Sequence, residues 1–292
     1  MGTDSRYIIP LARVDPSHEP LVGAKSARLG ILAKDGHPVA PGFCVRVEAY
    51  ERFLTDSRLE TLIRMELDRK RFEDMRWEEL WDAALRIRSA FTAQPVPTAV
   101  AAAVDEALAG YPADLAWAVR SSAPGEDAGN RSFAGLHESY VGVVGREAVL
   151  DAMRLVWASL WSDAAMLYRR EVGLDPAHSR MAVLIQAMRI AAVSGVAFGR
   201  DPRHGSGDIA IIEAVPGLCA GLVDGEVDPD RWRLRRADGT IVAWQRGHRV
   251  PAGGPDPLLD SADLSHLLRV LAAVEALFRW PPDIEWTGRA EQ

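Results

Sequence analysis

The sequence has little of what marks disulfide-rich, zinc-binding, membrane or nucleic-acid-binding proteins. Only two cysteines occur, Cys44 and Cys219, with no CxxC pair and no histidine at metal-ligand spacing, so neither a disulfide framework nor a zinc site is expected. No window approaches the roughly 20 apolar residues of a membrane helix, and the N-terminus lacks a basic region followed by an apolar stretch. The net charge of −7 disfavours binding to phosphate backbones through counterion release. We therefore expect a cytoplasmic protein that binds neither nucleic acid nor membrane.

What is present is the ordinary composition of a globular protein. Of the 292 residues, 48% are hydrophobic and 26% are charged, which is the balance of a chain that folds around apolar cores rather than remaining disordered. The length suggests about two compact units. No internal repeat or low-complexity tract interrupts the chain.

Hydrophobic periodicity predicts mixed α and β structure in the first part of the chain. Residues 7–12 form a short apolar run typical of a strand, and the segment VGAKSARLGILAKDG predicts a helix that ends at Gly36 and carries Lys25 in its first turn. Residues 47–92 contain no Gly or Pro and predict a set of amphipathic helices. The segment QPVPTAVAAAVDEALAGYP predicts another helix, which leads into a buried strand, LAWAVRSSA.

The rest of the chain also predicts a mixture of helices and strands. Residues 125–135 are small, polar and Gly-rich, as expected of a mobile loop that can close over a ligand, and a strand near SYVGVV follows. Apolar spacing from Arg146 to Arg170 predicts one helix. Successive β elements are predicted at AVLIQAM, SGVAFGR, DIAIIEAV and WRLRR, then a helix at SADLSHLLRVLAAVEALFRW and a short strand at PPDIEW. We predict an α/β fold of the α+β kind with antiparallel pieces.

Several residues suit a nucleoside triphosphate, which requires cations for its oxygens, flexible backbone around it and carboxylates for Mg²⁺. Lys25 opens a helix after Gly23, and Arg120 ends a buried strand. Asp283 and Glu285 are two apart in a predicted strand and so share one face. Each feature taken alone has a simpler interpretation. The lysine is then solvent-exposed, the arginine forms a surface ion pair, the two carboxylates lie on the polar edge of a strand, and the Gly-rich loop only connects two elements.

The order of the fragments favours the functional interpretation. The matching segments run from about residue 20 to residue 286 and are VGAKSARLG, HPVAPGFCV with a following AYERFL, VRSSAPGED, SFAGLHESYVGV, VWASLWSDAAMLYRR, AVLIQAM, SGVAFGRDP, PGL, GEVDPDRW and PDIEW. In this combination the chain resembles the N-terminal ATP-grasp domain of the phosphoenolpyruvate synthase, pyruvate phosphate dikinase and rifampin phosphotransferase family. The resemblance implies an ATP-grasp-like fold with two lobes and a nucleotide cleft between them.

The resemblance also implies roles for residues of the first lobe, which we expect at residues 1–180. Lys25 and Arg120 would be the catalytic cations that hold the ATP phosphates, as suits a point ammonium and a forked guanidinium. Gly135 and Ser139 would lie in or beside the Gly-rich lid loop that covers the phosphates.

The second lobe, expected at residues 181–292, would hold the adenine hinge and the metal ligands. The hinge would include Gln186 and Met188, although Met188 is equally well interpreted as a core side chain. Glu213 matches a family carboxylate at the ATP site. Glu285 would be the Mg²⁺ ligand, with Asp283 beside it as a weaker candidate.

The sequence departs from the family pattern at several positions. Ala24 stands where a second glycine commonly precedes the lysine, and the usual Gly-Leu-Gly-Glu reads Gly217, Leu218, Cys219 and Ala220, so that its carboxylate is missing. FAGLHES lacks the glutamines often found after FAG. The chain stops at Gln292, where the family continues into a strand with a Gln and an Arg. None of the seven histidines has the Gly-rich, Thr/Ser-His setting of the family's phosphate carrier.

Three functional hypotheses follow. The first is the ATP-binding domain of an ATP-dependent, dikinase-type phosphotransferase: ATP is split to AMP, and phosphate passes through a histidine to a small-molecule acceptor. The expected partners are a swivelling phosphohistidine domain and an acceptor-binding domain, in cis or in trans, and the expected cofactors are ATP and Mg²⁺. The alternatives are a non-catalytic nucleotide-binding or regulatory module, and an ATP-grasp ligase that makes an acyl phosphate.

Overall fold

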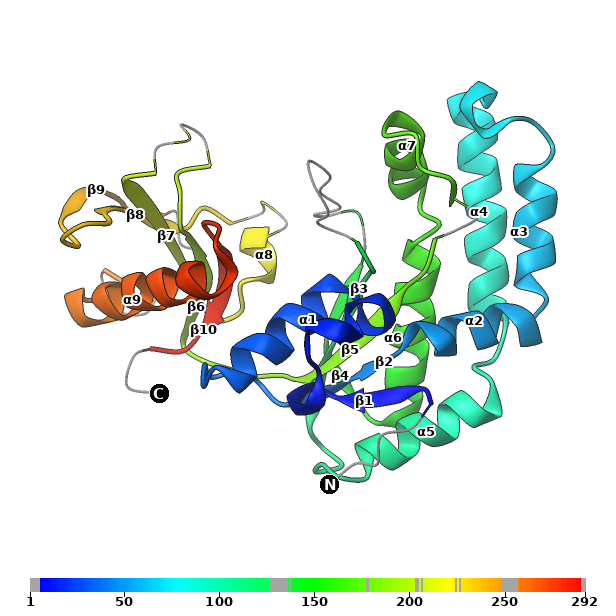
Figure 1. Cartoon of the computed structure of the whole chain (residues 1–292), viewed down its shortest axis with the longest axis horizontal. Helices are drawn as coiled ribbons and strands as arrows, with labels where there is room; N and C mark the ends of the chain where they lie inside the picture. The colour runs from blue at the N-terminus through cyan, green and yellow to red at the C-terminus, as the bar shows by residue number, and fades with distance from the viewer. Residues whose placement is uncertain are drawn as a thin grey trace. The chain divides into compact units, whose positions relative to one another are not determined.

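The computed structural model describes residues 6–125, 136, 138–176, 179–202, 205, 207–223, 225, 227–247 and 257–289. The chain divides into two compact units, Met1–Met188 (unit 1) and Arg189–Gln292 (unit 2). Each unit combines helices with one antiparallel sheet, so the predicted α+β class is confirmed (Figure 1). The division falls after Met188 rather than after residue 180, because the strand Ala182–Ala187 pairs with two strands of unit 1.

Unit 1 is built on a five-stranded sheet with the order β1-β2-β5-β3-β4, in which all neighbouring strands are antiparallel. Its strands are β1 (Ile8–Pro10), β2 (Gly42–Val45), β3 (Ala116–Ser122), β4 (Ser139–Val144) and β5 (Ala182–Ala187). The central strand β5 is buried along its whole length, as its uninterrupted apolar sequence predicts.

Seven α-helices are described in unit 1. They are α1 (Glu19–Lys34), α2 (Val47–Asp56), α3 (Leu59–Leu67), α4 (Trp77–Ala93), α5 (Thr98–Leu108), α6 (Arg146–Ser159) and α7 (Asp163–Glu171). The set of helices predicted for residues 47–92 is confirmed by α2, α3 and α4. The single helix predicted for 146–170 is wrong, because the chain breaks at Leu160 and restarts at Ser162, whose hydroxyl accepts the Ala165 amide as an N-cap.

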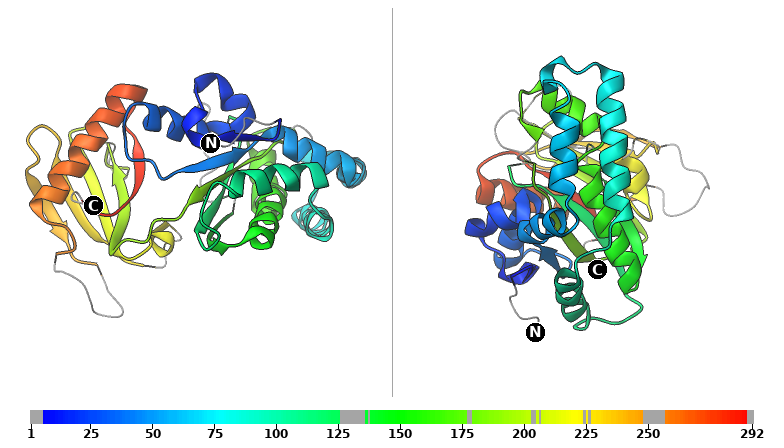
Figure 2. Two further views of the ribbon diagram at one scale, coloured as in Figure 1. Left: turned by 90° about the horizontal axis from the view of Figure 1, so that it is seen from below. Right: turned by 90° about the vertical axis from the view of Figure 1, so that its right-hand side faces the viewer.

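The two faces of this sheet carry different cores. The larger core includes alternate residues of β5, Val183 and Ile185, and a group of large aromatic side chains: Tyr50, Phe53, Phe91, Trp157 and Trp161. Leu184 points the other way, into a smaller core with Cys44 of β2 and with Val22 and Ala27 of α1. Helix α1 therefore covers part of one face, which we call the α1 face (Figures 1 and 2).

Unit 2 contains a second five-stranded antiparallel sheet with the order β10-β6-β7-β8-β9. Its elements are β6 (Val193–Phe198), β7 (Ile209–Pro216), α8 (Ala220–Val223), β8 (Asp230–Arg235), β9 (Ile241–Gln245), α9 (Ser261–Phe278) and β10 (Asp283–Thr287). Helix α9 begins at the N-cap Asp260, whose carboxylate accepts the amides of Ala262 and Asp263.

One face of this second sheet packs on α9, as Figure 1 shows. Ile212, Trp232 and Leu234 from the strands meet Leu264 and Leu271 of α9 in a single core. The opposite face, which we call the open face, carries alternate residues of the same strands. Within the described parts of the chain, no helix combines the length and the apolar character needed to cross a bilayer.

Candidate functional site

Helix α1 contains a sharp kink just before Lys25. Gly23 has φ 78° and ψ 164°, which no helical residue adopts, so the helical segment that carries Lys25 begins after it. Any side chain at Gly23 would force the backbone of Gly23 or Ser122 to shift, because the added Cβ would lie 2.1 Å from the Ser122 carbonyl oxygen. The predicted position of Lys25 in the first turn of a helix is confirmed.

The start of this segment is tied to the end of β3. The Ala24 amide donates to the Ala123 carbonyl at 3.2 Å, and the Ser26 amide donates to the Ser122 hydroxyl at 3.1 Å. That hydroxyl in turn donates to the Val22 carbonyl at 2.7 Å. Lys25 is flanked by two residues whose amides are held in this way, so its partly buried side chain starts from a fixed backbone.

Strand pairing brings Arg120 onto the same face as α1. Arg120 lies directly opposite Ser139 of β4 and Leu184 of β5. Directly opposed residues of antiparallel strands point to the same side of the sheet. Because Leu184 packs in the core beneath α1, Arg120 and Ser139 also belong to the α1 face.

Gln186 extends this group. It lies opposite Ala118 of β3, two residues from Arg120, and opposite Gly42 of β2, so it too faces the α1 side. Its side chain is 9% exposed, and its amide nitrogen donates to the Ala40 carbonyl at 2.9 Å. Gln186 therefore fixes the loop before β2, and the adenine contact that the family resemblance implies for it stays a prediction.

Met188 follows the end of β5. Its amide donates to the Ala116 carbonyl, and its sulfur accepts the Gly142 amide at 3.2 Å. The side chain is partly exposed and belongs to neither described core of unit 1, which weighs against the core-packing interpretation. The contact with an adenine base stays a prediction. Gly135, together with residues 126–134 of the predicted lid loop, lies outside the described residues.

In unit 2 the two predicted metal ligands occupy one face of β10. Asp283 and Glu285 are exposed, whereas Ile284 and Trp286 alternate with them and pack toward the α9 core. The alternation expected from their spacing is thus observed, and both carboxylates belong to the open face. Exposed carboxylate oxygens are the donor type that Mg²⁺ prefers.

Glu213 of β7 lies on the same open face. Val196 of β6 is opposite both Glu285 and Glu213, so the two glutamates are separated by one intervening strand, or about 10 Å. Arg231 of β8 is opposite Glu213 and donates from Nε to its carboxylate at 2.5 Å. Among the described residues, no three His, Cys, Asp or Glu side chains gather closely enough to hold a metal ion by themselves.

Two arginines of this face were not singled out from the sequence. Arg231 and Arg233 point to the same side of β8, and Arg233 forms an ion pair with Asp201 at 3.1 Å. Their two-residue spacing in the segment RWR is the same alternation that identified Asp283 and Glu285, so the pattern could have found them. The open face therefore carries both signs of charge.

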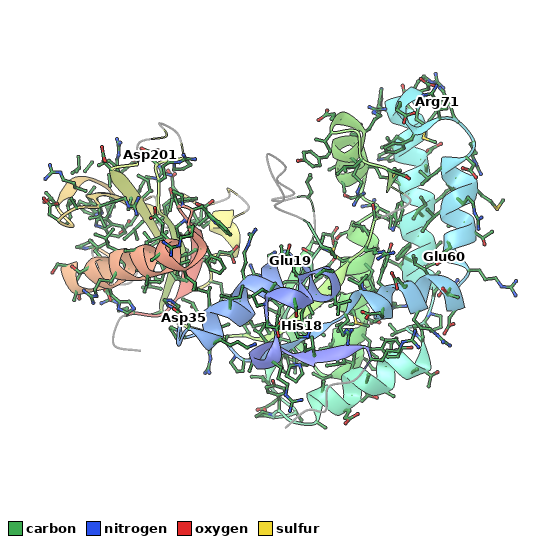
Figure 3. All side chains as sticks on the ribbon, viewed as in Figure 1. His18, Glu19, Asp35, Glu60, Arg71 and Asp201 are labelled. Carbon is green, nitrogen blue, oxygen red and sulfur yellow. The ribbon has the colours of Figure 1, made fainter. Side chains whose placement is uncertain are left out.

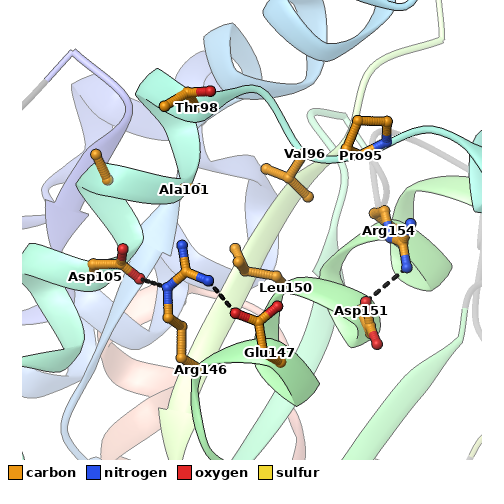
Figure 4. A pocket seen from close by; sticks show the side chains of 11 residues that line it. Pro95, Val96, Thr98, Ala101, Asp105, Arg146, Glu147, Leu150, Asp151 and Arg154 are labelled. Atoms are coloured by element: carbon orange, nitrogen blue, oxygen red, sulfur yellow. Dashed lines mark hydrogen bonds and ion pairs between the residues drawn. The ribbon is translucent and has the colours of Figure 1, made fainter.

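A separate hollow of about 370 Å³ lies between α5 and α6 of unit 1 (Figure 4). Its charged side chains pair with one another: Arg146 with Asp105 and Glu147, and Arg154 with Asp151. No predicted site residue lines it. We therefore assign it no part in the nucleotide site.

The fold and the site together define an α+β, ATP-grasp-like nucleotide-binding domain. Residues 19–292 match the family described as pyruvate phosphate dikinase, AMP/ATP-binding domain. This chain belongs to that family, as its sequence motifs indicated.

Curated relatives carry two kinds of name. A rifampicin phosphotransferase of Streptomyces sviceus is 36% identical over 302 residues, which cover 96% of this chain and 34% of that protein. A phosphoenolpyruvate synthase of Aeropyrum pernix is 32% identical over 330 residues, covering 97% of this chain and 40% of that protein. A rifampicin phosphotransferase of Bacillus subtilis is 29% identical over 300 residues, covering 97% of this chain and 34% of that protein. The chain thus spans between a third and two fifths of the length of these relatives.

Proposed function

We propose that this chain is the ATP-binding module of a dikinase-type phosphotransferase, in which ATP is split to AMP and phosphate passes through a histidine to a small-molecule acceptor. One observation carries the proposal: strand register collects Arg120, Ser139 and Gln186 on the α1 face, and the segment that carries Lys25 is hydrogen-bonded to the end of the same strand as Arg120. Cations and hydrogen-bonding side chains are thereby concentrated where a polyphosphate and a base need them.

The cations supply the electrostatic part of the chemistry. Lys25 and Arg120 bind the phosphate oxygens and stabilise the negative charge that develops as the terminal pyrophosphoryl unit leaves AMP. Ser139 at the start of β4 is assigned to the phosphates as well, and Gly135 keeps the phosphate-binding role that the family resemblance implies for it. A fixed lysine and arginine lose little orientation entropy on reaching the transition state, which is the advantage of anchoring α1 to β3.

The adenine base is assigned to Gln186 and Met188, at the end of β5. The amide of Gln186 uses one of its hydrogens on Ala40, and its remaining hydrogen and carbonyl oxygen are the groups that suit a purine edge. Glu213 is assigned to the nucleotide as well, with Arg231 holding its carboxylate in place.

Mg²⁺ is assigned to Glu285 and Asp283. A bound Mg²⁺ neutralises charge on the transferred phosphates, and it is usually held by one or two carboxylates plus substrate oxygens rather than by a protein cage. The exposed pair on β10 fits this pattern better than a preformed cluster would. The proposed phosphate cations and base-binding residues belong to unit 1, and the proposed metal-binding carboxylates belong to unit 2.

Transfer needs further components. A swivelling phosphohistidine domain would receive the phosphate, and an acceptor-binding domain would hold a small molecule, the kind of acceptor that the name rifampicin phosphotransferase gives for that relative. We place the reaction in the cytoplasm, where ATP and a reducing environment occur together.

A non-catalytic nucleotide-binding module is the second candidate. It is favoured by one observation: the Gly217–Ala220 segment lacks the carboxylate that the family pattern has there. The product separates the candidates, because a dikinase forms AMP, an ATP-grasp ligase forms ADP and a regulatory module forms neither.

The test combines binding with product analysis. Calorimetric titration of the chain with ATP, with and without Mg²⁺, is expected to give measurable binding that Mg²⁺ strengthens and that Glu285→Gln makes insensitive to Mg²⁺. Asp208→Asn, which removes an exposed carboxylate elsewhere in unit 2, is the matched control. AMP is expected only after a phosphohistidine domain from a relative is added. Absence of ATP binding, or formation of ADP in place of AMP, would overturn the proposal.

A further inference from the structure

The serine that ends β3 is completely buried and lies on the side of the sheet that faces the helix of Lys25. Ser122 is 0% exposed and follows Arg120 by two residues, so both side chains belong to the α1 face. Helix α1 packs against this strand, and Glu19 and Asp35 mark the two ends of the helix in Figure 3. A buried hydroxyl is costly unless it is hydrogen-bonded, so its partners show what it holds in place.

The Ser122 hydroxyl caps the helical segment that begins after the kink at Gly23. The first amides of a helix lack partners within the helix, and the residue before them usually supplies a side-chain oxygen. Gly23 has no side chain. The Ser122 hydroxyl supplies the oxygen instead: it accepts the Ser26 amide at 3.1 Å and donates to the Val22 carbonyl at 2.7 Å. The cap of this segment is therefore a residue 96 positions beyond the amide that it accepts.

The Ser26 side chain strengthens the same connection. Its hydroxyl donates to the Ser122 hydroxyl at 3.1 Å, and it also hydrogen-bonds the Cys44 thiol of β2. All three side chains are 0% exposed. Elements α1, β2 and β3 thus meet in one buried polar network, whose hydrogen bonds reinforce one another, so that removal of one member disturbs the others.

Lys25 lies between two anchored residues. Ala24 and Ser26, on either side of it, are 3% and 0% exposed, whereas Lys25 itself is partly exposed. Because the backbone on both sides is held, a ligand has to immobilise only the lysine side chain, and less entropy is lost than for a lysine on a free segment. The cap therefore affects ligand binding by Lys25 as well as stability.

We propose that Ser122 is a positioning residue of the nucleotide site: its hydroxyl holds the Lys25 segment against the strand of Arg120, so that the two cations bind the triphosphate as a pair. The inference rests on the proposed function, in which Lys25 and Arg120 are the phosphate-binding cations, and it adds a residue that touches no ligand. Loss of the hydroxyl leaves both charges in place and changes only how the lysine is presented.

The ATP affinity of two serine variants provides the first test. Ser122→Ala removes the cap and is expected to raise the Kd for ATP about fivefold, a size typical of coupling within one hydrogen-bond network. Ser121→Ala is the matched control, because Ser121 is 2% exposed on the same strand but lies opposite Val183 and so faces the larger core. It should leave the Kd unchanged. Chemical denaturation verifies that both variants are folded under the conditions of the titration.

A double-mutant cycle separates positioning from a general loss of stability. Lys25→Ala is expected to raise the Kd about 30-fold, since a charged donor to a phosphate is lost. Because Ser122 acts through the lysine, adding Ser122→Ala to this variant should raise the Kd no further. Independent effects would multiply to about 150-fold. That result, or an unchanged Kd for Ser122→Ala alone, would overturn the inference.

The Lys25→Ala variant alone identifies which proposal has failed. If the unaltered chain does not bind ATP, or if Lys25→Ala leaves the Kd unchanged, the assignment of Lys25 to the phosphates is wrong and the role of Ser122 is overturned with it. If Lys25→Ala weakens binding and Ser122→Ala does not, only the positioning role is wrong.

A milder variant keeps the cycle informative should Ser122→Ala not fold. Ser122→Cys retains a group of similar shape with a weaker hydrogen-bond acceptor, so we expect it to raise the Kd about threefold. Combined with Lys25→Ala it should add nothing to the effect of the lysine variant. An unchanged Kd for Ser122→Cys, or a combined effect of about 90-fold, would contradict the positioning role.

Discussion

The two units use sheets of the same size in different ways. In unit 1 helices pack on both faces of the sheet, and the predicted site residues lie on the α1 face, beside the smaller core. In unit 2 a single long helix, α9, covers one face, and the other carries arginines and carboxylates. In both units the functional candidates lie where helix packing stops. The cores therefore maintain the sheets, and the incompletely covered faces carry the candidate site residues.

The largest expected effects come from removing core tryptophans, and they test whether each core stabilises its own unit. Trp157 is 0% exposed and stacks on Phe53 with ring centroids 5.1 Å apart, so Trp157→Ala should cost about 3–5 kcal/mol of unfolding free energy. Trp232, 2% exposed, is its counterpart in unit 2. Hydrogen exchange should show lost protection in the mutated unit and retained protection in the other.

Exposed Trp280 provides the control for this pair, since Trp280→Ala should change the unfolding free energy by less than about 0.5 kcal/mol. Equal loss of protection throughout the chain in both core variants would show that the units are not energetically separate.

A smaller effect is expected at the kink of α1, where one unit's core meets its candidate site. Gly23→Ala forces a Cβ to within 2.1 Å of the Ser122 carbonyl oxygen at φ 78°, so it should cost about 2–4 kcal/mol and also displace Lys25. Gly36→Ala is the matched control, because Gly36 has φ 89° with no atom near the added Cβ, and it should cost about 1 kcal/mol. Chemical denaturation measures both. If both substitutions lowered the unfolding free energy equally, the close approach of Gly23 to Ser122 would not be the cause of the destabilisation.

The smallest effect concerns the two cysteines, one in each unit. Burial raises the pKa of the Cys44 thiol to about 12, against a weaker opposing hydrogen bond from Ser26. The stability associated with the neutral thiol is present below its unfolded pKa and is lost as pH rises toward 12. At pH 8 a thiol reagent should therefore modify partly exposed Cys219 and spare Cys44, which should react only through unfolding.

Mass spectrometry of peptides gives the two rates separately, and the Cys219→Ser variant isolates Cys44. Rapid labelling of Cys44 in the folded chain would mean that the smaller core beneath α1 is looser than its packing indicates.

Local patterns were sufficient to predict much of this molecule. Lys25 at a helix start and the paired carboxylates of β10 follow from periodicities that any isolated segment shows. The strand end expected at Arg120 is wrong, because β3 continues to Ser122. Pairing could not be predicted in the same way. That Arg120 is opposite Ser139, or that β5 joins unit 1, depends on contacts between residues far apart in the chain, which no local pattern encodes.

The break between α6 and α7 illustrates the same limit at short range. Apolar spacing continues from Leu160 to Leu167, so the period alone predicts one helix. The Ser162 hydroxyl competes for a backbone amide and starts a new helix, and only the folded environment decides that competition. Similarly, Gln186 was predicted from family resemblance as a base-binding residue, and its bond to Ala40 emerged only from the structure.

The most direct test of the proposed ATP site is the affinity of the Arg120→Ala variant for ATP. Loss of a charged donor to a partly buried phosphate should cost about 2 kcal/mol, equivalent to about a 30-fold higher Kd measured by calorimetry. Arg64→Ala, which removes an exposed arginine on α3, should leave the Kd unchanged, and denaturation curves should show that both variants are folded. An Arg120→Ala chain that binds ATP as tightly as the unaltered protein would contradict the placement of the phosphates on the α1 face.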